Sequence, residues 1–262
     1  MKKLFVFLCA IIIGTAFGET KNITWKVGDN TYATSTCEVG DDLIIPQNTP
    51  TKYGYHFVGW AAYTFLEYIE STGTQYIDTG VACNYDSYDF DITVSKPTGT
   101  YASVIFIHDP SRNMRFNVAQ AVVVDQTLNL NLGDTPTTTT VLDYSLLSEP
   151  LHLTKHIGTN SAYGTVNNVA YNCSYSNNSY KINDHNIILM AKATKSGDSY
   201  TISEQFAGKL YNCVIIANNV LIRNLVPAKR NSDNTVGMYD TVTNIFFTNA
   251  GTGTFIAGPA KQ

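Results

Sequence analysis

Short stretches of alternating apolar and polar residues follow one another through residues 63–262, and turn residues separate them. In "SYDFDITVS" the two kinds take alternate positions, with Tyr88, Phe90 and Ile92 on one side and Asp89, Asp91 and Thr93 on the other. A period of two indicates a β-strand with one buried face, whereas a helix repeats every 3.6 residues. We expect a helical turn only at "SEQFAG" (203–208). The region therefore predicts an all-β sandwich or jelly roll.

A glycine-rich segment, "FFTNAGTGTF" (246–255), lies near the C-terminus. A phosphate-binding loop would lead into the N-terminus of a helix. Here "TFIAGP" follows, which is typical of a strand that a proline ends. We therefore interpret Gly251 and Gly253 as backbone bends that lead into a closing strand.

The first residues are typical of a secretory signal. Lys2 and Lys3 precede an apolar run at residues 4–13, and small residues at Ala16 and Gly18 predict cleavage after Gly18. The run is shorter than the roughly 20 apolar residues of a membrane span, and no later segment approaches that length. The alternative is an uncleaved interfacial anchor. We expect residues 1–18 to be a signal peptide, and the protein to be secreted or at the cell surface, with no membrane span in the mature chain.

The charge balance argues against a nucleic-acid partner. The net charge is −4, and loss of the two lysines with the signal makes it −6, so no basic surface for phosphates is expected. Charged residues are only 15% of the chain, against about a quarter in an average protein. Together with 17 tyrosines, this composition favours half-exposed strands over helices.

Four cysteines remain after export: Cys37, Cys83, Cys173 and Cys213. In an oxidising compartment they allow up to two disulfides in three connectivities. We consider Cys173–Cys213 first, because both residues lie in strand-like sequence of the same domain. Free buried thiols are the alternative. No Cys-x-x-Cys pair is present, so we expect no zinc site.

Residues 19–62 form a separate small unit. The strand "NITWKV" begins it, a second short strand is expected at "DDLIIP", and "YGYHFVGW" ends it. Because a unit of this size buries little apolar surface, we expect Tyr55, Phe57 and Trp60 to form its core. The alternative is that these aromatic residues form an exposed platform for a ligand. "VGDDLIIPQNTPTKYGYHFVGW" resembles the internalin-type B-repeat of bacterial surface proteins, although "GDNTYA" replaces the usual Gly-Gly.

The remaining 200 residues carry a second resemblance. "YIESTGTQYIDTG", "LYNCVIIANNVLIRNLVP" and "GMYDTVTNIFFTNAGTGTF" are similar to the laminin-G-like, concanavalin A-like jelly roll of secreted bacterial and phage-associated proteins. The resemblance implies that the first and last strands lie side by side, with residues 246–255 next to residues 65–79. Asn218 and Asn219 predict a tight hairpin. Ala228 stands where members often carry a cysteine.

Two pairs of residues have spacings that resemble those of catalytic or metal-binding pairs. Asp89 and Asp91 share a strand face roughly 6.6 Å apart, which fits a glycosidase carboxyl pair. Glycosidases of the resembled fold carry Glu-x-Asp-x-Glu, and both outer glutamates are absent, so we interpret the pair as a solvent-facing row. His152 and His156 would lie about 13 Å apart on a strand, too far to share a zinc ion, and we interpret them as surface or edge residues. We assign no catalytic or metal-binding residue and expect no enzyme.

Two sets of loop residues stay open as ligand contacts. A structural calcium ion could be bound by loop carboxylates, and we assign none of the candidates as a ligand: Asp134, Asp184, Asp198 and Asp240. Sugar rings could stack on tyrosines near turns, although such residues also cover strands: Tyr85, Tyr88, Tyr163, Tyr175 and Tyr200.

Both resemblances imply a non-catalytic binding or adhesion protein that recognises a glycan or a cell-surface partner through loops of a lectin-like jelly roll. No cofactor is expected, and the ligand-binding residues are not assigned. The first alternative is a structural or assembly component of a surface or phage-tail-like appendage. The second is a glycoside hydrolase on the same fold.

Overall fold

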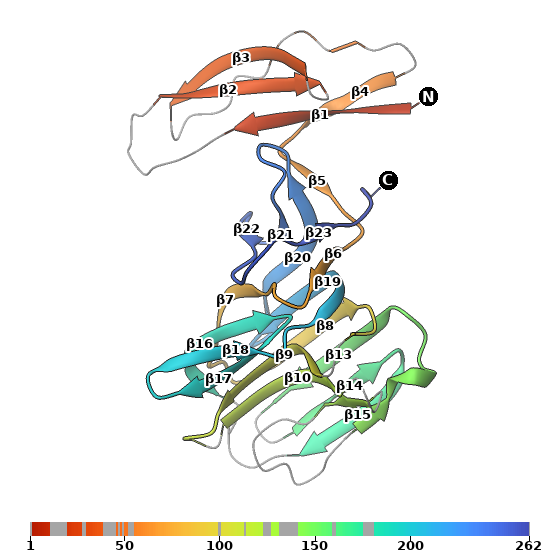
Figure 1. The fold of residues 1–262 in the computed structure, drawn as a ribbon, viewed down its shortest axis with the longest axis vertical. Helices are drawn as coiled ribbons and strands as arrows, with labels where there is room; N and C mark the ends of the chain where they lie inside the picture. The colour runs from red at the N-terminus through yellow and green to blue at the C-terminus, as the bar shows by residue number, and fades with distance from the viewer. Residues whose placement is uncertain are drawn as a thin grey trace. The chain divides into compact units, whose positions relative to one another are not determined.

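The structure is a computed structural model that describes residues 2–10, 20–27, 30–38, 46, 48, 50–51, 55–98, 101–112, 114–122, 127–130, 141–158, 161–174 and 181–261. Most of them lie in strands, and none lies in an α-helix (Figure 1). The predicted all-β class is therefore confirmed. The helical turn expected at residues 203–208 is wrong, because strands extend into this segment from both sides. A 3-10 turn forms instead at η1 (Tyr144–Leu146). Over the same ranges, no helix has the length and apolar character needed to cross a bilayer.

The chain divides into two compact units. Unit 1 comprises residues 1–65, 228–235 and 260–262, and unit 2 comprises residues 66–227 and 236–259. The sequence analysis places the junction between residues 62 and 63. The structure places it after Phe65 and adds two stretches near the C-terminus to the small unit.

Unit 1 contains a four-stranded sheet in the order β3 (Asn30–Glu38), β2 (Thr20–Val27), β1 (Lys2–Ala10) and β4 (Tyr55–Ala61). The strands expected at "NITWKV" and "HFVGW" are β2 and β4. The strand expected at residues 41–45 lies outside the described residues. A short strand, β5 (Tyr63–Phe65), pairs with residues 228–230.

Trp25 and Ile23 on β2 are large buried apolar side chains of unit 1, at 1% and 2% exposure. The indole Nε1 of Trp25 donates a hydrogen bond to Ser35 Oγ on β3 at 3.0 Å. The side chains of Tyr55, Phe57 and Trp60 lie outside the described set, so their role as a core stays a prediction.

Residues 2–10 of the predicted signal form strand β1, which pairs with β2 and β4. Residues 11–19, and with them the cleavage site after Gly18, lie outside the described residues. Cleavage there would remove β1 and take away the strand between β2 and β4.

Two large sheets make up most of unit 2 (Figure 1). The first has the order β12 (Val141–Asp143), β11 (Thr127–Asn129), β10 (Met114–Val122), β9 (Tyr101–Asp109), β17 (Lys192–Ser196) and β18 (Ser199–Ser203). The second has the order β15 (Val169–Ser174), β14 (Ser161–Val166), β13 (Leu151–Ile157), β8 (Tyr88–Val94), β19 (Ala207–Ala217), β20 (Val220–Arg230), β21 (Val236–Asp240) and β22 (Phe246–Thr248), with β6 (Ile69–Thr72) beside β19 and β23 (Ile256–Ala257) beside β6. β7 (Ile77–Cys83) and β16 (Ile182–Leu189) form a separate pair.

The core of unit 2 lies between these sheets, which gives the unit a β-sandwich-like fold. Tyr88 and Phe90 on β8 face inward, and both rings contact Phe116 of the opposite sheet edge to face, at centroid distances of 5.2 and 5.9 Å. Such aromatic pairs add about 0.5–1.5 kcal/mol each beyond their burial. The alternation read in "SYDFDITVS" is therefore confirmed, with its apolar residues buried and its aspartates facing outward.

The two ends of the resembled domain meet as expected. β23 pairs with β6, and the amides of Ala250 and Thr252 donate to the carbonyls of Tyr76 and Thr74 at 2.9 and 3.2 Å. A Cβ on Gly251 would lie 2.2 Å from the Thr74 carbonyl oxygen, so only glycine permits this approach. The glycine-rich segment is structural, and the prediction that residues 246–255 lie beside residues 65–79 is confirmed.

Tight asparagine turns connect two of the hairpins. Asn218 and Asn219 have φ angles of 48° and 62° and join β19 to β20, as the sequence predicts. Asn167 and Asn168 do the same between β14 and β15, with φ angles of 46° and 67°. Asparagine tolerates this left-handed conformation, which two-residue hairpin turns require.

Candidate functional site

Four neighbouring strands of the second sheet, β14, β13, β8 and β19, carry the candidate site. Along each strand, residues two apart share a face. The register between the strands then aligns the outward-facing residues in rows across the sheet. One row is Tyr163, His156, Asp89 and Ile216, and the next is Thr165, Thr154, Asp91 and Val214. We call the side chains of these two rows, together with Thr93, His152 and Asn212, the His–Asp face.

Each aspartate of this face is paired with a histidine of β13. His156 Nδ1 lies 2.7 Å from Asp89 Oδ1, and His152 Nε2 lies 3.0 Å from Asp91 Oδ1. Asn212 on β19 donates a further bond to Asp91 Oδ1 at 3.3 Å. Since a carboxylate only accepts, the bonded ring nitrogens donate, and the second nitrogen of a neutral imidazole is left as an acceptor.

The structure confirms part of the expectation for these residues. Asp89 and Asp91 face solvent, and the histidines lie on the surface, with side-chain exposures between 29% and 47%. Their mutual pairing was not expected. The histidines do not share a ligand, and no cluster of metal-binding side chains occurs among the residues that the structure describes.

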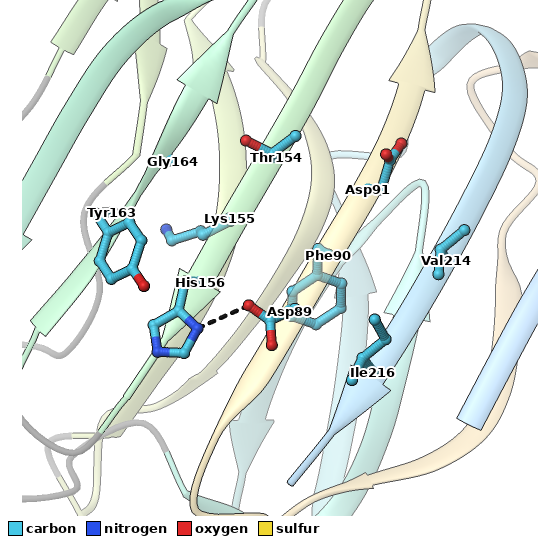
Figure 2. Close-up of a pocket in the computed structure, with 10 residues that line it drawn as sticks. All are labelled: Asp89, Phe90, Asp91, Thr154, Lys155, His156, Tyr163, Gly164, Val214 and Ile216. Atoms are coloured by element: carbon cyan, nitrogen blue, oxygen red, sulfur yellow. Dashed lines mark hydrogen bonds and ion pairs between the residues drawn. The ribbon is translucent and has the colours of Figure 1, made fainter. Parts of the chain in front are cut away.

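An aromatic stack closes one end of the face. The imidazole of His156 and the phenol ring of Tyr163 stack with centroids 4.7 Å apart and planes inclined by 28°. Tyr163 is 54% exposed, so one face of this stack is open to a ligand. Figure 2 shows the two rings side by side, with Asp89 opposite His156 and Asp91 further along β8.

A pocket of about 290 Å³ lies over these residues (Figure 2). Residues from all four strands line it: Asp89, Phe90, Asp91, Thr154, Lys155, His156, Tyr163, Gly164, Val214 and Ile216. The side chains of Phe90 and Lys155 point into the sandwich, so the side chains that face the hollow belong to the outward residues.

Lys155 supports the face from below. It follows the inward positions of β13 and is 1% exposed, and its Nζ reaches three backbone carbonyls of the opposite sheet. The distances are 2.6 Å to Asn117 O, 3.3 Å to Val118 O and 2.7 Å to Leu130 O. Each of these carbonyls accepts a hydrogen bond from the ammonium. The contact fixes β13, which carries both histidines, to the other sheet.

Gly164 permits the close approach of β14 to β13. A Cβ at this position would lie 2.0 Å from the Thr154 carbonyl oxygen, a distance at which backbone would have to move. The same carbonyl accepts a hydrogen bond from the Tyr171 hydroxyl at 3.0 Å. The glycine thus holds Tyr163 in register with His156.

The Cys173–Cys213 disulfide is not formed in the structure. Cys213 is a free buried thiol, and the side chain of Cys173 lies outside the described set. Cys173 lies on β15 and Cys213 on β19, four strand steps away, which is about 19 Å along the sheet. A disulfide needs Cα atoms about 4.4–6.8 Å apart. The position of both cysteines on strands of the same domain was not enough to predict a disulfide, because the order of the strands in the sheet decides which residues meet.

The alternative expectation, free buried thiols, holds for both Cys83 and Cys213. Burial raises the pKa of each thiol, and a nearby carboxylate adds to the effect, Asp78 for Cys83 and Asp91 for Cys213. Neither is a thiolate at neutral pH, so neither suits nucleophilic chemistry.

Of the four carboxylates left open for calcium, the structure describes the side chains of two. Asp134 lies outside the described residues, as does the side chain of Asp184, and Asp198 is exposed in the turn between β17 and β18. Asp240 is fully buried and accepts bonds from the amides of Asn224 and Val242 at 2.9 and 3.1 Å. Its oxygens therefore hold a turn.

The tyrosines considered for stacking on sugar rings differ in their position and burial. Tyr88 is fully buried, and its hydroxyl donates to Ala82 O at 2.7 Å. Tyr85 and Tyr200 are half-buried against the core, and Tyr175 lies outside the described residues. Tyr163 alone of the described members lies on the His–Asp face. A cross-strand alignment of "HLTKH" with "YDFDIT" is the signal that would have revealed this face.

In comparisons with known proteins, no family model and no curated protein matches this chain.

Proposed function

We propose that the protein is an exported, non-catalytic binding protein that recognises a glycan on the His–Asp face. The observation that carries this proposal is a row of paired carboxylates and imidazoles that ends at an exposed aromatic stack. It differs from the expectation of a loop site, because the sheet itself offers the polar groups.

The chemistry of this face suits a sugar. Asp89 and Asp91 each bond one histidine and keep lone pairs for hydroxyl donors, while His156 offers an acceptor nitrogen. Tyr163 presents an open ring on which the apolar C–H face of a sugar can stack. Rigid strands hold all these groups, which limits the ordering cost of binding.

The resemblances favour the same function. A laminin-G-like, concanavalin A-like jelly roll in residues 63–262, a B-repeat-like unit before it and a signal peptide would together make a surface adhesion protein. This part of the proposal is an analogy of fold, and the site carries the weight.

A glycan array tests the proposal on the full chain. We expect binding to a defined group of glycans, and Tyr163→Ala and His156→Ala should each weaken it at least tenfold, about 1.4 kcal/mol. Tyr101→Ala is the matched control, because Tyr101 is also an exposed tyrosine (50%) but lies on the opposite sheet. An array without binding, from a protein that forms a defined oligomer, would instead favour an assembly component.

A glycoside hydrolase is the second candidate, favoured by the position of Asp89 and Asp91 on one face. Hydrolysis would require one of them to act as a proton donor. Release of reducing ends from polysaccharides, abolished by Asp91→Asn, would establish this activity and overturn the non-catalytic proposal.

A further inference from the structure

A second aromatic cluster lies on the same sheet, outside the site described above. The rings of Tyr68 and Tyr211 meet edge to face with centroids 5.5 Å apart, and Lys209 Nζ lies 4.5 Å from the centroid of the Tyr68 ring. All three side chains are half-buried. We call these three residues the tyrosine cluster.

Strand β19 connects the tyrosine cluster to the His–Asp face. Leu210 points into the core and pairs with Val94, and a bulge then turns both Tyr211 and Asn212 outward. Asn212 already belongs to the His–Asp face through its bond to Asp91. The tyrosine cluster therefore opens on the same side of the sheet, where β6, β19 and β8 are neighbours (Figure 1).

The two aromatic groups stand at opposite ends of a polar strip. Tyr211 lies in the bulge beside Asn212, and Ile216 shares a row with His156 and Tyr163. From Asn212 to Ile216 the strand advances four residues, or about 13 Å. Between these ends the strip presents hydrogen-bonding groups from three strands: Thr93, Asn212, His152, Asp91 and Thr154.

The polar groups of the tyrosine cluster suit an uncharged ligand. Lys209 lies opposite Glu70 in the strand pairing, so its charge is locally balanced. Burial raises the pKa of the Tyr211 phenol, the charge of Lys209 opposes this shift, and Glu149 is among the groups that add to it. The phenol is protonated at neutral pH and can donate a hydrogen bond. Glutamates near this end disfavour an anionic chain.

We propose that the ligand is a linear, uncharged oligosaccharide that spans both aromatic ends of this strip, with Tyr211 as a second stacking subsite. Tyr68, whose ring lies under Lys209 and against Gly258, positions the Tyr211 ring. This inference rests on the proposed function and extends it, because it specifies the length and charge of the glycan. A single sugar or a disaccharide would occupy the His156–Tyr163 end alone.

Calorimetry with unbranched oligosaccharide ladders tests the inference on the full chain. The probes are cello-, laminari- and chito-oligosaccharides from disaccharide to hexasaccharide. We expect the affinity to rise with length and then to level off once the chain spans the strip. Tyr211→Ala and Tyr68→Ala should reduce the hexasaccharide affinity at least tenfold and leave disaccharide binding unchanged, whereas Tyr163→Ala should weaken both.

Two conservative variants and one footprint complete the test. Tyr68→Phe and Tyr211→Phe keep the rings and should keep most of the affinity. Should the alanine variants not fold, hydrogen exchange of the wild type replaces them, with protection of residues 66–72 and 207–211 by hexasaccharide and not by disaccharide. Equal affinity for short and long chains, or no protection there, would overturn this inference while the proposed function stands. Absence of binding to every ladder and array member would overturn both.

Discussion

Two polar groups of unit 2 lie on opposite sides of the same strand, and their hydrogen bonding differs. Lys155 points into the sandwich, where its Nζ donates to three carbonyls. Its neighbours His156 and Thr154 point outward, where His156 bonds one carboxylate and remains part exposed. A buried ammonium that donates to carbonyls inside the sandwich is not accessible to a ligand, whereas an exposed group with bonding capacity to spare can bind one.

This comparison predicts that inward changes alter stability and outward changes alter binding. The first test is Lys155→Met, which keeps the stem and leaves three buried carbonyls without their donor. We expect a loss of about 3 kcal/mol in the free energy of unfolding, measured by denaturant titration. Lys96→Met is the control, because Lys96 makes one surface bond to Ser145 O, and it should cost less than about 0.5 kcal/mol. Wild-type stability of Lys155→Met would show that the carbonyls do not need the ammonium.

A second test uses pH and a buried carboxylate. Burial alone would raise the pKa of Asp109, but hydrogen bonds from Ser111 and Arg112 and the charge of Arg112 outweigh it, so the pKa is lowered. Because the folded pKa lies below the unfolded value of about 3.9, the carboxylate stabilises the fold above that pH and loses its contribution as the pH falls through the folded pKa.

Asp109→Asn should therefore cost about 1–2 kcal/mol at neutral pH, and the difference from wild type should shrink in acid. Asp143→Asn is the control, since Asp143 makes similar bonds to Ser145 on the surface and should leave the free energy of unfolding close to that of the wild type. A constant deficit of Asp109→Asn across the pH range would contradict the linkage.

The smallest stability effect is expected on the His–Asp face. Asp89→Asn and His156→Ala should change the free energy of unfolding by less than about 1 kcal/mol, because part-exposed pairs contribute little. The same variants should weaken glycan binding about tenfold. Unfolding of either variant would show that the Asp89–His156 pair is needed for the stability of the fold, as Lys155 is.

The sequence predicts the strands better than it predicts their partners. Alternation in "SYDFDITVS" placed Phe90 inside and Asp89 outside, and the glycines at 251 and 253 identified the bend before the closing strand. These features depend on neighbours along the chain, and such patterns are local.

The site depends on strand order, which local patterns do not contain. His156 meets Asp89 only because β13 pairs with β8 in one register, and Cys213 misses Cys173 because three strands lie between theirs. Lys155 did leave a local signal, since in "LHLTKHI" it occupies the same phase as Leu153 and Ile157. A charged residue at an apolar position of this kind indicates an inward lysine with partners of its own.

Hydrogen exchange with the strongest glycan from the array tests the central claim most directly. The account predicts slower exchange in β14, β13, β8 and β19, with β9, β10 and β11 of the opposite sheet unchanged. Protection confined to the connecting loops, or to the opposite sheet, would contradict a binding site on the His–Asp face.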